Sequence, residues 1–451
     1  MHPLITCSVI ASILAAAMTF ATNTAEPTTA SSVTPPADDG KFLVHEWGTF
    51  TTFSGSDGLF IDFRPLDVKH ADLPDYVFDR GSFSDGLGKL FLKNRLRGRV
   101  RMETPVTYFY TDRFRTVDVR VDFPAGLLTE FYPPARQLLP PIDEDNIFGK
   151  GELIGNSSLH WGNVDLIPTA ELVPNLTDAG LRERVTSSIV HSLIPHAANE
   201  QHYAAARETD AALVHVRNAS DTQSYFEKFL FYRGVGKFQL PITTHFDGER
   251  VVVSNAGGLP IRSLILINVD GKKIQATRRD LVSAGQSLPF DGLQTVNQEQ
   301  LATMVQQSLV GEGLYEKEAT SMVNTWQQSW FTENGLRVLY ILPGPTTEEL
   351  LPLHVTPKPQ QMLRIMVGRM EVMSPTSEQK MTNAVAESTA LRALHYAEQQ
   401  KSNTNLPYSI PTTIQDFGRM AEPALVRVAT ITQDTALRNE AEMLIEQFRA
   451  N

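Results

Sequence analysis

The segment 45–51, with the sequence HEWGTFT, places two adjacent titratable side chains inside an apolar stretch. Side chains alternate between the two faces of a β-strand. One face therefore carries Leu43, His45, Trp47 and Thr49, and the other carries Phe42, Val44, Glu46, Gly48 and Phe50. Buried titratable groups need partners, and they are common at sites with shifted pKa values. Two interpretations stay open: a binding or catalytic role, or a satisfied buried pair.

In the second interpretation, Glu46 pairs with Arg101 or Arg120, and His45 donates to a backbone carbonyl. Each face of the strand then hides one polar group among apolar neighbours. Such groups are buried only when hydrogen bonds or opposite charges compensate them.

A second concentration of polar side chains lies just before a predicted strand, where Arg207, Glu208 and Asp210 surround a small hydroxyl at Thr209. Loops that enter strands often carry functional sites, and an arginine with two carboxylates can bind a polar ligand or a cation. The same residues can equally form an ordinary cluster of caps and ion pairs. Both possibilities remain at this stage.

Carboxylates from distant segments can form an acid/base pair without leaving a local motif. The candidates for such a pair are Glu46, Glu103, Glu208 and Asp210, and His45 and Arg207 complete the set of candidate catalytic residues. Their convergence on one accessible pocket would favour a hydrolase. Separate ion pairs for each of them would favour a structural role.

Other site chemistries find little support in the sequence. His191 and His196 lie about 140° apart on a helix, and no HExxH pattern accompanies them or His202. Cys7 is the only cysteine, so zinc sites built from cysteines are excluded. Gly234 and Gly236 lack the third glycine of a dinucleotide fingerprint, and no Walker loop is present. The sequence therefore predicts neither a metal nor a cofactor.

The pattern of apolar residues predicts an α+β protein of several domains, β-rich and sandwich-like over its N-terminal two thirds. Strands are predicted for 42–53, 100–111, 117–123, 226–233, 239–246, 250–254, 259–269 and 272–277. The predicted divisions are a β-rich domain at 41–175, a helical connection at 176–211 and a sandwich-like domain at 212–290. An α/β segment at 291–373 and a helical region at 374–451 complete the chain.

The first residues differ from the rest of the sequence. No charged residue occurs between Leu4 and Ala21, and Thr19 and Ala21 are small residues suited to cleavage before Thr22. Residues 1–21 are therefore predicted to be a signal peptide, although the basic residues that usually precede the apolar run are missing, and retention as an anchor stays open. Residues 22–40, rich in Thr, Ser and Pro, are predicted to be a disordered linker. Removal of the leader would also remove Cys7 and leave a cysteine-free chain.

Several longer strings carry a resemblance. They are HEWGTFT from His45, ETPVTYFY from Glu103, HYAAARETDA from His202 and TWQQSWFTENGLRVLYILP from Thr325. Together they resemble a family of large, uncharacterised exported bacterial proteins, and the similarity runs over most of the chain after the leader. The resemblance implies an exported bacterial protein, and it implies no activity, ligand or catalytic residue.

The net charge of −11 over 451 residues argues against a nucleic-acid partner, because phosphate binding needs a basic face. Two functions remain. One is a non-catalytic periplasmic or extracellular protein that binds an envelope polymer or another protein, with no transmembrane span after the leader. The alternative is an exported hydrolase that uses carboxylate acid/base residues.

Overall fold

A sheet of ten strands forms the centre of the protein. The computed structural model describes residues 40–63, 73–80, 97–141, 154–217, 223–402 and 407–450. In spatial order the strands are β16 (Gln294–Val296), β14 (Lys273–Val282), β13 (Ile261–Asp270), β17 (Gly335–Ile341), β19 (Gln361–Val372), β1 (Phe42–Ser54), β3 (Val100–Thr111), β10 (Leu230–Gly236), β5 (Gly126–Tyr132) and β2 (Phe78–Asp79). β1 and β19 run in parallel, whereas their other neighbours pair antiparallel. The sheet thus combines strands from three predicted segments, 41–175, 212–290 and 291–373.

Two smaller sheets pack against one face of this large sheet. One contains β18 (Leu353–Thr356), β4 (Arg115–Phe123), β7 (Ser157–Ile167), β8 (Leu213–Arg217) and β9 (Ser224–Glu227), with β6 (Gln137–Leu139) paired to β7. The other contains β11 (Ile242–Asp247), β12 (Arg250–Asn255) and β15 (Ser287–Phe290). One apolar core joins all three sheets, and it includes Val44 and Phe109 from the large sheet, Val119 from β4 and Val253 from β12. This layering is that of a β-sandwich.

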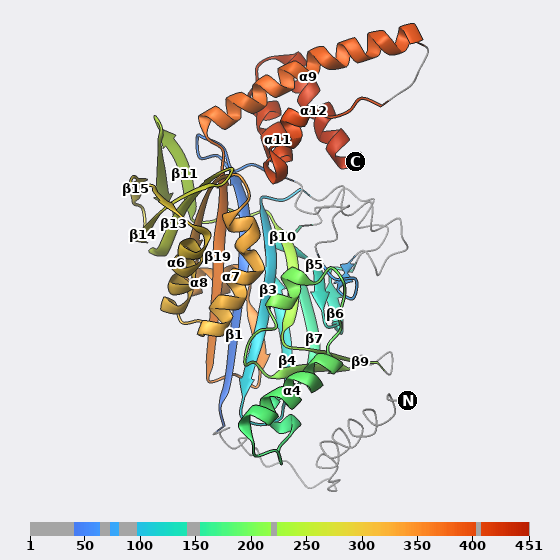
Figure 1. Ribbon diagram of the computed structural model, residues 1–451, viewed down its shortest axis with the longest axis vertical. Helices are drawn as coiled ribbons and strands as arrows, with labels where there is room; N and C mark the ends of the chain where they lie inside the picture. Colours follow the sequence, from blue (N-terminus) through green and yellow to red (C-terminus); the bar gives the residue numbers. More distant parts are fainter. Residues whose placement is uncertain are drawn as a thin grey trace.

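Helices cover the opposite face of the large sheet (Figure 1). The main ones are α6 (Gln298–Gly311) and α7 (Glu316–Phe331), and α5 (Gln201–Ala205) packs against α7. Trp47, Val106 and Tyr108 from the sheet meet Met322 and Trp330 of α7 in a second apolar core. As predicted, Trp326 and Trp330 are core residues, with exposed fractions of 8% and 0%.

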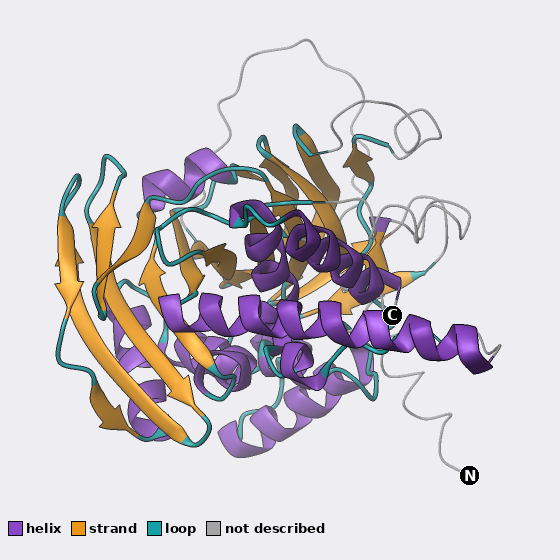
Figure 2. Ribbon diagram, turned by 90° about the horizontal axis from the view of Figure 1, so that it is seen from above, coloured by secondary structure: helices purple, strands orange, loops and turns teal. Residues whose placement is uncertain are grey.

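The C-terminal helices form a separate region across one end of the sheets (Figure 2). They are α9 (Pro375–Ser402), α10 (Thr412–Gln415), α11 (Ala421–Ile431) and α12 (Thr435–Ala450), with a 3₁₀ turn η3 (Gly418–Met420). Their own core contains Met381, Leu425 and Leu444, and Phe53 from the end of β1 packs into it. The helical period predicted after residue 374 is confirmed.

The remaining helices in the described ranges are η2 (Thr169–Leu172), α4 (Ala179–Leu193) and α8 (Gly344–Leu350). α4 packs against η2, and α8 packs against β19. The protein is therefore α+β, β-rich and composed of more than one domain, as the sequence predicts. Within the described ranges, no helix is both long enough and apolar enough to span a membrane. The predicted signal peptide lies outside the described residues, as does the predicted linker apart from Gly40.

Most predicted strand bounds lie within three residues of the observed ones, although the strand predicted at 272–277 continues to Val282 as β14. A second exception is more informative. The predicted strand 226–233 is two strands, because β9 ends at Glu227 in the six-stranded sheet and β10 starts at Leu230 in the ten-stranded sheet. The crossing residue Lys228 is buried, and its ammonium donates to the carbonyl oxygen of Ala211. The charged residues Glu227 and Lys228 lie at the crossing, but aromatic and apolar residues follow on both sides, and this pattern does not indicate that the chain changes sheets.

Candidate functional site

His45 and Glu318 form a buried polar pair beneath the N-terminus of α7. The exposed fractions of the two side chains are 1% and 0%. His45 Nδ1 lies 3.0 Å from Glu318 Oε2, and Tyr110 donates its hydroxyl to Glu318 Oε1 over 2.7 Å. The backbone N–H of Tyr315 also donates to Glu318, over 2.8 Å. The acceptor of His45 is thus a carboxylate and not the backbone carbonyl expected from the sequence.

The rings of Tyr110 and Tyr315 cover this pair. The ring centroid of Tyr315 lies 4.6 Å from that of His45, and the centroid of Tyr110 lies 5.4 Å from it. The two tyrosine rings meet edge to face, with centroids 5.1 Å apart. Burial and the nearby charge of Glu318 raise the pKa of Tyr110, so its hydroxyl keeps the proton that it donates.

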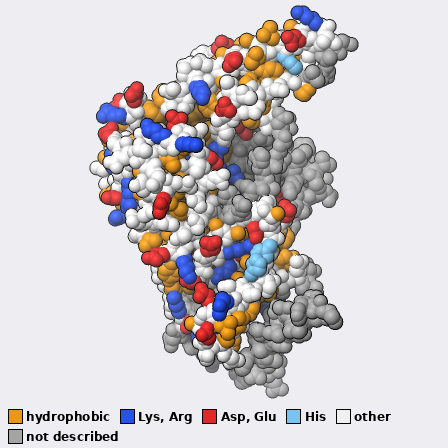
Figure 3. Space-filling view, in the orientation of Figure 1, with side chains coloured by type: hydrophobic (Ala, Val, Ile, Leu, Met, Phe, Trp, Pro, Cys, Tyr) orange, Lys and Arg blue, Asp and Glu red, His pale blue; other side chains and the backbone are white. Residues whose placement is uncertain are grey.

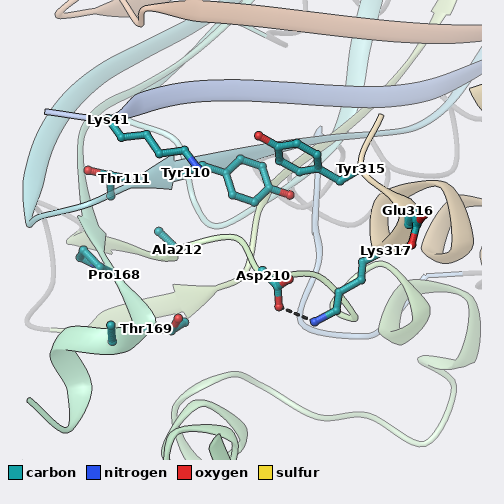
Figure 4. A pocket seen from close by; sticks show the side chains of 11 residues that line it. Lys41, Tyr110, Thr111, Pro168, Thr169, Asp210, Ala212, Tyr315, Glu316 and Lys317 are labelled. Atoms are coloured by element: carbon teal, nitrogen blue, oxygen red, sulfur yellow. Dashed lines mark hydrogen bonds and ion pairs between the residues drawn. The ribbon is translucent and has the colours of Figure 1, made fainter. Parts of the chain in front are cut away.

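These two tyrosines also line a pocket of about 580 Å³ (Figure 4). The pocket lies where the start of β1, the end of β3 and the start of α7 meet the turn after β7. Its lining comes from Lys41, Tyr110, Thr111, Pro168, Thr169, Ala170, Asp210, Ala212, Tyr315, Glu316 and Lys317. A pocket of this size accommodates a small polar ligand or a segment of a polymer.

Charged side chains surround the aromatic part of the pocket. Asp210 and Lys317 form an ion pair of 2.6 Å, and both are exposed to solvent. Lys41 and Glu316 are also exposed, and in the described part of the chain neither forms an ion pair. Groups of both signs are therefore available to orient a polar ligand. Figure 3 shows acidic and basic side chains interspersed over the described part of one molecular face, as on an ordinary solvated surface.

Glu46 lies on the opposite face of β1, away from the pocket. Its carboxylate accepts from Arg364 Nε over 2.7 Å, from Thr107 over 2.8 Å and from Tyr232 over 2.7 Å. Burial lowers the pKa of Arg364, but Glu46, Tyr232 and Glu348 together outweigh this effect and raise the pKa. The prediction that Glu46 pairs with Arg101 or Arg120 is therefore wrong, because the parallel partner strand β19 supplies the arginine.

Glu103 belongs to a third buried polar cluster, near the C-terminal helices. It is 2% exposed, pairs with Arg101 over 3.2 Å and accepts from the Thr51 hydroxyl over 2.6 Å. Burial raises the pKa of Glu103, but the charges of Arg101, Arg419 and Arg369 and the Thr51 hydrogen bond lower it to about 2. Glu103 thus acts as a permanently charged structural group.

Arg207 belongs to a fourth cluster. Its guanidinium pairs with Glu227 over 2.8 Å and with Glu200 over 3.1 Å, and it lies over the rings of Tyr76 and Tyr203. The charge of Glu227 raises the pKa of Arg207 in spite of the opposing effect of burial. This arrangement corresponds to the ion-pair interpretation of the 207–210 segment.

The six candidates therefore belong to different clusters. His45, Glu208 and Asp210 all lie against α7, since the Glu208 carbonyl accepts from Ser321 and Asp210 pairs with Lys317. Among the six, only Asp210 lines the pocket, and the Glu208 side chain is exposed. In the described ranges, no group of three or more His, Cys, Asp or Glu side chains is arranged to hold a metal.

Sequence reasoning missed the residues that build the pocket, namely Lys41, Tyr110, Tyr315 and Lys317, and the buried partner Glu318. Glu318 is 273 positions from His45, so no spacing connects them. Two local signals were available. Tyr108 and Tyr110 alternate onto the helix-covered face of β3, and Glu318 occupies the third position of a helix whose first turn is acidic.

Comparisons with known proteins leave the family open. No protein-family model matches the sequence, and no curated protein matches it. Among solved structures, the chain is similar to the Mu homology domain of Fcho1 from Danio rerio with a bound Eps15 peptide, at 8% identity and a TM-score of 0.24, covering 74% of this chain and 95% of that one. It is also similar to the yeast delta-COP-I mu-homology domain, at 9% identity and a TM-score of 0.23, covering 75% and 97%. Similarities this weak assign neither a fold family nor a ligand.

Replacement of Glu46 by glutamine tests its structural role. Arg364 pairs with the buried Glu46 and with the half-exposed Glu348, and the substitution removes its buried partner, so Glu46→Gln should lower the free energy of unfolding by about 3 kcal/mol. Asp210→Asn, in an exposed pair, should lower it by less than about 1 kcal/mol. Urea unfolding at neutral pH measures both variants, and equal effects would contradict the assignment.

Acid should weaken the protein through Glu103. The folded-state pKa of about 2 lies below the usual value of 4.5, so the stabilisation is complete above pH 4.5 and is lost as the pH falls toward 2. This loss amounts to about 3 kcal/mol. Between pH 6 and pH 3, Glu103→Gln should therefore lose less stability than the wild type. Glu316→Gln, at an exposed position, should lose as much as the wild type, and a pH dependence unchanged by Glu103→Gln would refute the prediction.

Proposed function

We propose that the protein is an exported, non-catalytic binding protein of the bacterial envelope or the extracellular space, and that its pocket holds a segment of a polysaccharide. The observation that carries this proposal is the pocket of about 580 Å³ walled by Tyr110 and Tyr315. Aromatic faces bind the apolar faces of sugar rings, and polar groups around them fix the orientation of the hydroxyls.

The composition of the pocket suits a ligand with many hydroxyl groups. Lys41 and Lys317 offer donors, Asp210 and Glu316 offer acceptors, and the hydroxyls of Thr111 and Thr169 can act as either. Since a sugar hydroxyl both donates and accepts, a ring of mixed polar groups fits it better than a site of one charge would. The pocket also lies at the surface, where a chain longer than the pocket can continue into solvent.

A binding role is supported over hydrolysis by the state of the acid/base candidates. Glu46, Glu103 and Arg207 each have structural partners. The carboxylates that line the pocket, Asp210 and Glu316, are both exposed, whereas the general acid of a glycosidase sits in an apolar environment. Glu318 is the buried carboxylate behind the pocket wall, and it is already bound by His45, Tyr110 and Tyr315. The described residues thus offer pocket walls and orienting groups, while the buried carboxylate is engaged in structural contacts.

Export is supported by the sequence alone. The uncharged apolar run from Leu4 to Ala21, the small residues at Thr19 and Ala21 and the following segment rich in Thr and Pro form the pattern of a secreted protein. The resemblance to exported bacterial proteins adds to this. A polysaccharide ligand is consistent with such a location, because envelope and extracellular polymers are accessible there.

Binding is tested by titrating the purified protein with peptidoglycan fragments and a panel of neutral and acidic oligosaccharides. We expect at least one of them to bind, and Tyr315→Ala should weaken that binding about tenfold or more, because one aromatic wall is lost. The matched control is Tyr396→Ala, which removes a tyrosine that is 50% exposed on α9. Isothermal calorimetry that shows no binding, or equal effects of the two variants, would exclude this function.

Export is tested in a bacterial host by mass spectrometry of the protein recovered outside the cytoplasm. We expect its first residue to be Thr22. Leu14→Arg, which interrupts the apolar run, should leave the protein in the cytoplasm, whereas Thr28→Arg, beyond the expected cleavage point, should not. Recovery of the unaltered chain from the cytoplasm, with Met1 retained, would be evidence against export.

A further inference from the structure

Behind the tyrosine wall of the pocket lies a polar atom without a partner. His45 is 1% exposed, and its Nε2 has no hydrogen-bond partner among the described residues. Buried side-chain nitrogens are nearly always hydrogen-bonded, since an unpaired one forfeits its interaction with water. The position of His45 directly beneath Tyr110 and Tyr315 connects this unpaired atom to the pocket.

The partners of Glu318 determine what Nε2 can do. The carboxylate accepts from the Tyr110 hydroxyl and from the Tyr315 N–H, and the remaining contact is His45 Nδ1 at 3.0 Å. Because a carboxylate only accepts, Nδ1 carries a hydrogen, and in the singly protonated form of the imidazole Nε2 carries none. Nε2 is then an acceptor, and a ligand that satisfies it must bring a donor.

Tyr315 lies between the His45 ring and the pocket. Its backbone N–H donates to Glu318 and its carbonyl oxygen accepts from Ala319, while its side chain is 40% exposed and stacks over His45 at a tilt of 38°. Rotation of an exposed aromatic ring is fast and leaves the backbone contact intact. The ring can therefore turn aside without unwinding α7.

We propose that Tyr315 turns aside when the ligand binds, and that His45 Nε2 then accepts a hydrogen bond from a saccharide hydroxyl. This inference rests on the proposed function and adds to it a specific contact. The bound sugar ring lies against the aromatic rings with one hydroxyl directed into the space above His45. Glu318 acts as a positioning residue, because it fixes the orientation and the tautomer of the imidazole.

The test uses the full chain labelled with ¹⁵N-histidine and the tightest-binding oligosaccharide of the panel. The Nε2 resonance of His45, assigned by its absence in His45→Phe, should shift on saturation with the ligand, because hydrogen bonding changes the shielding of an acceptor nitrogen. His354, an exposed histidine paired with Asp122, serves as the internal control and should not shift. A deoxy analogue that lacks the inserted hydroxyl should bind without shifting the His45 resonance.

The variant His45→Phe keeps a ring of similar shape but removes the acceptor, and its dissociation constant should rise about fivefold to tenfold. If it fails to fold, His45→Gln supplies the assignment of the resonance, and the labelled wild-type protein still decides the question. Saccharide binding that is lost in Tyr315→Ala but leaves the His45 resonance and the His45→Phe affinity unchanged would overturn this inference alone. Absence of saccharide binding altogether would overturn the proposed function, and this inference with it.

Discussion

The parallel pairing of β1 with β19 is the constraint on which the rest of the structure depends. Twelve residues of β1, from Leu43 to Ser54, are in register with Gln361 to Val372. Parallel strands cannot be joined by a short turn, and here they are separated by about three hundred residues of chain. β1 also pairs with β3 on its other side. It therefore joins the strands from β16 to β19 on one side of the large sheet to the strands from β3 to β2 on the other.

The same pairing determines where the buried charges lie. Because β1 is covered on both faces, its alternation sends Glu46 into the core between the sheets and His45 toward α7. Register places Arg364 of β19 beside Glu46. A shift of one strand by one residue would break that ion pair, since it would put the two side chains on opposite faces of the sheet. Each buried charge thus specifies a register as well as requiring a partner. A strand with only apolar residues would slide more easily.

The local sequence predicts the strands and helices, but it does not predict which side chains pair between distant segments. The run 100–111 predicts β3 with its observed bounds, and the stripe containing Trp326 and Trp330 predicts the buried face of α7. The alternation along β1 also predicts that His45 and Glu46 diverge. In contrast, Glu318 is 273 positions from His45 and Arg364 is 318 positions from Glu46, and no period or spacing encodes such pairs. The sequence alone therefore could not show which residues of the HEWGTFT segment have a structural role and which have a functional one.

The structure separates the two roles by the hydrogen-bond partners that each face of β1 provides. On the Glu46 face, an arginine, a tyrosine and a threonine all donate to one carboxylate, and this cluster has no link to the pocket. On the His45 face, Glu318 receives three donors, while the second nitrogen of the imidazole receives nothing from the described residues. Because Glu318 contacts only Nδ1, it fixes the orientation of the imidazole and leaves Nε2 buried without a partner beneath the exposed Tyr315 ring. Other buried polar atoms of β1, in Trp47 and Thr49, also have no partner among the described residues. His45 differs from them in its ring contacts with Tyr110 and Tyr315, the two tyrosines that line the pocket.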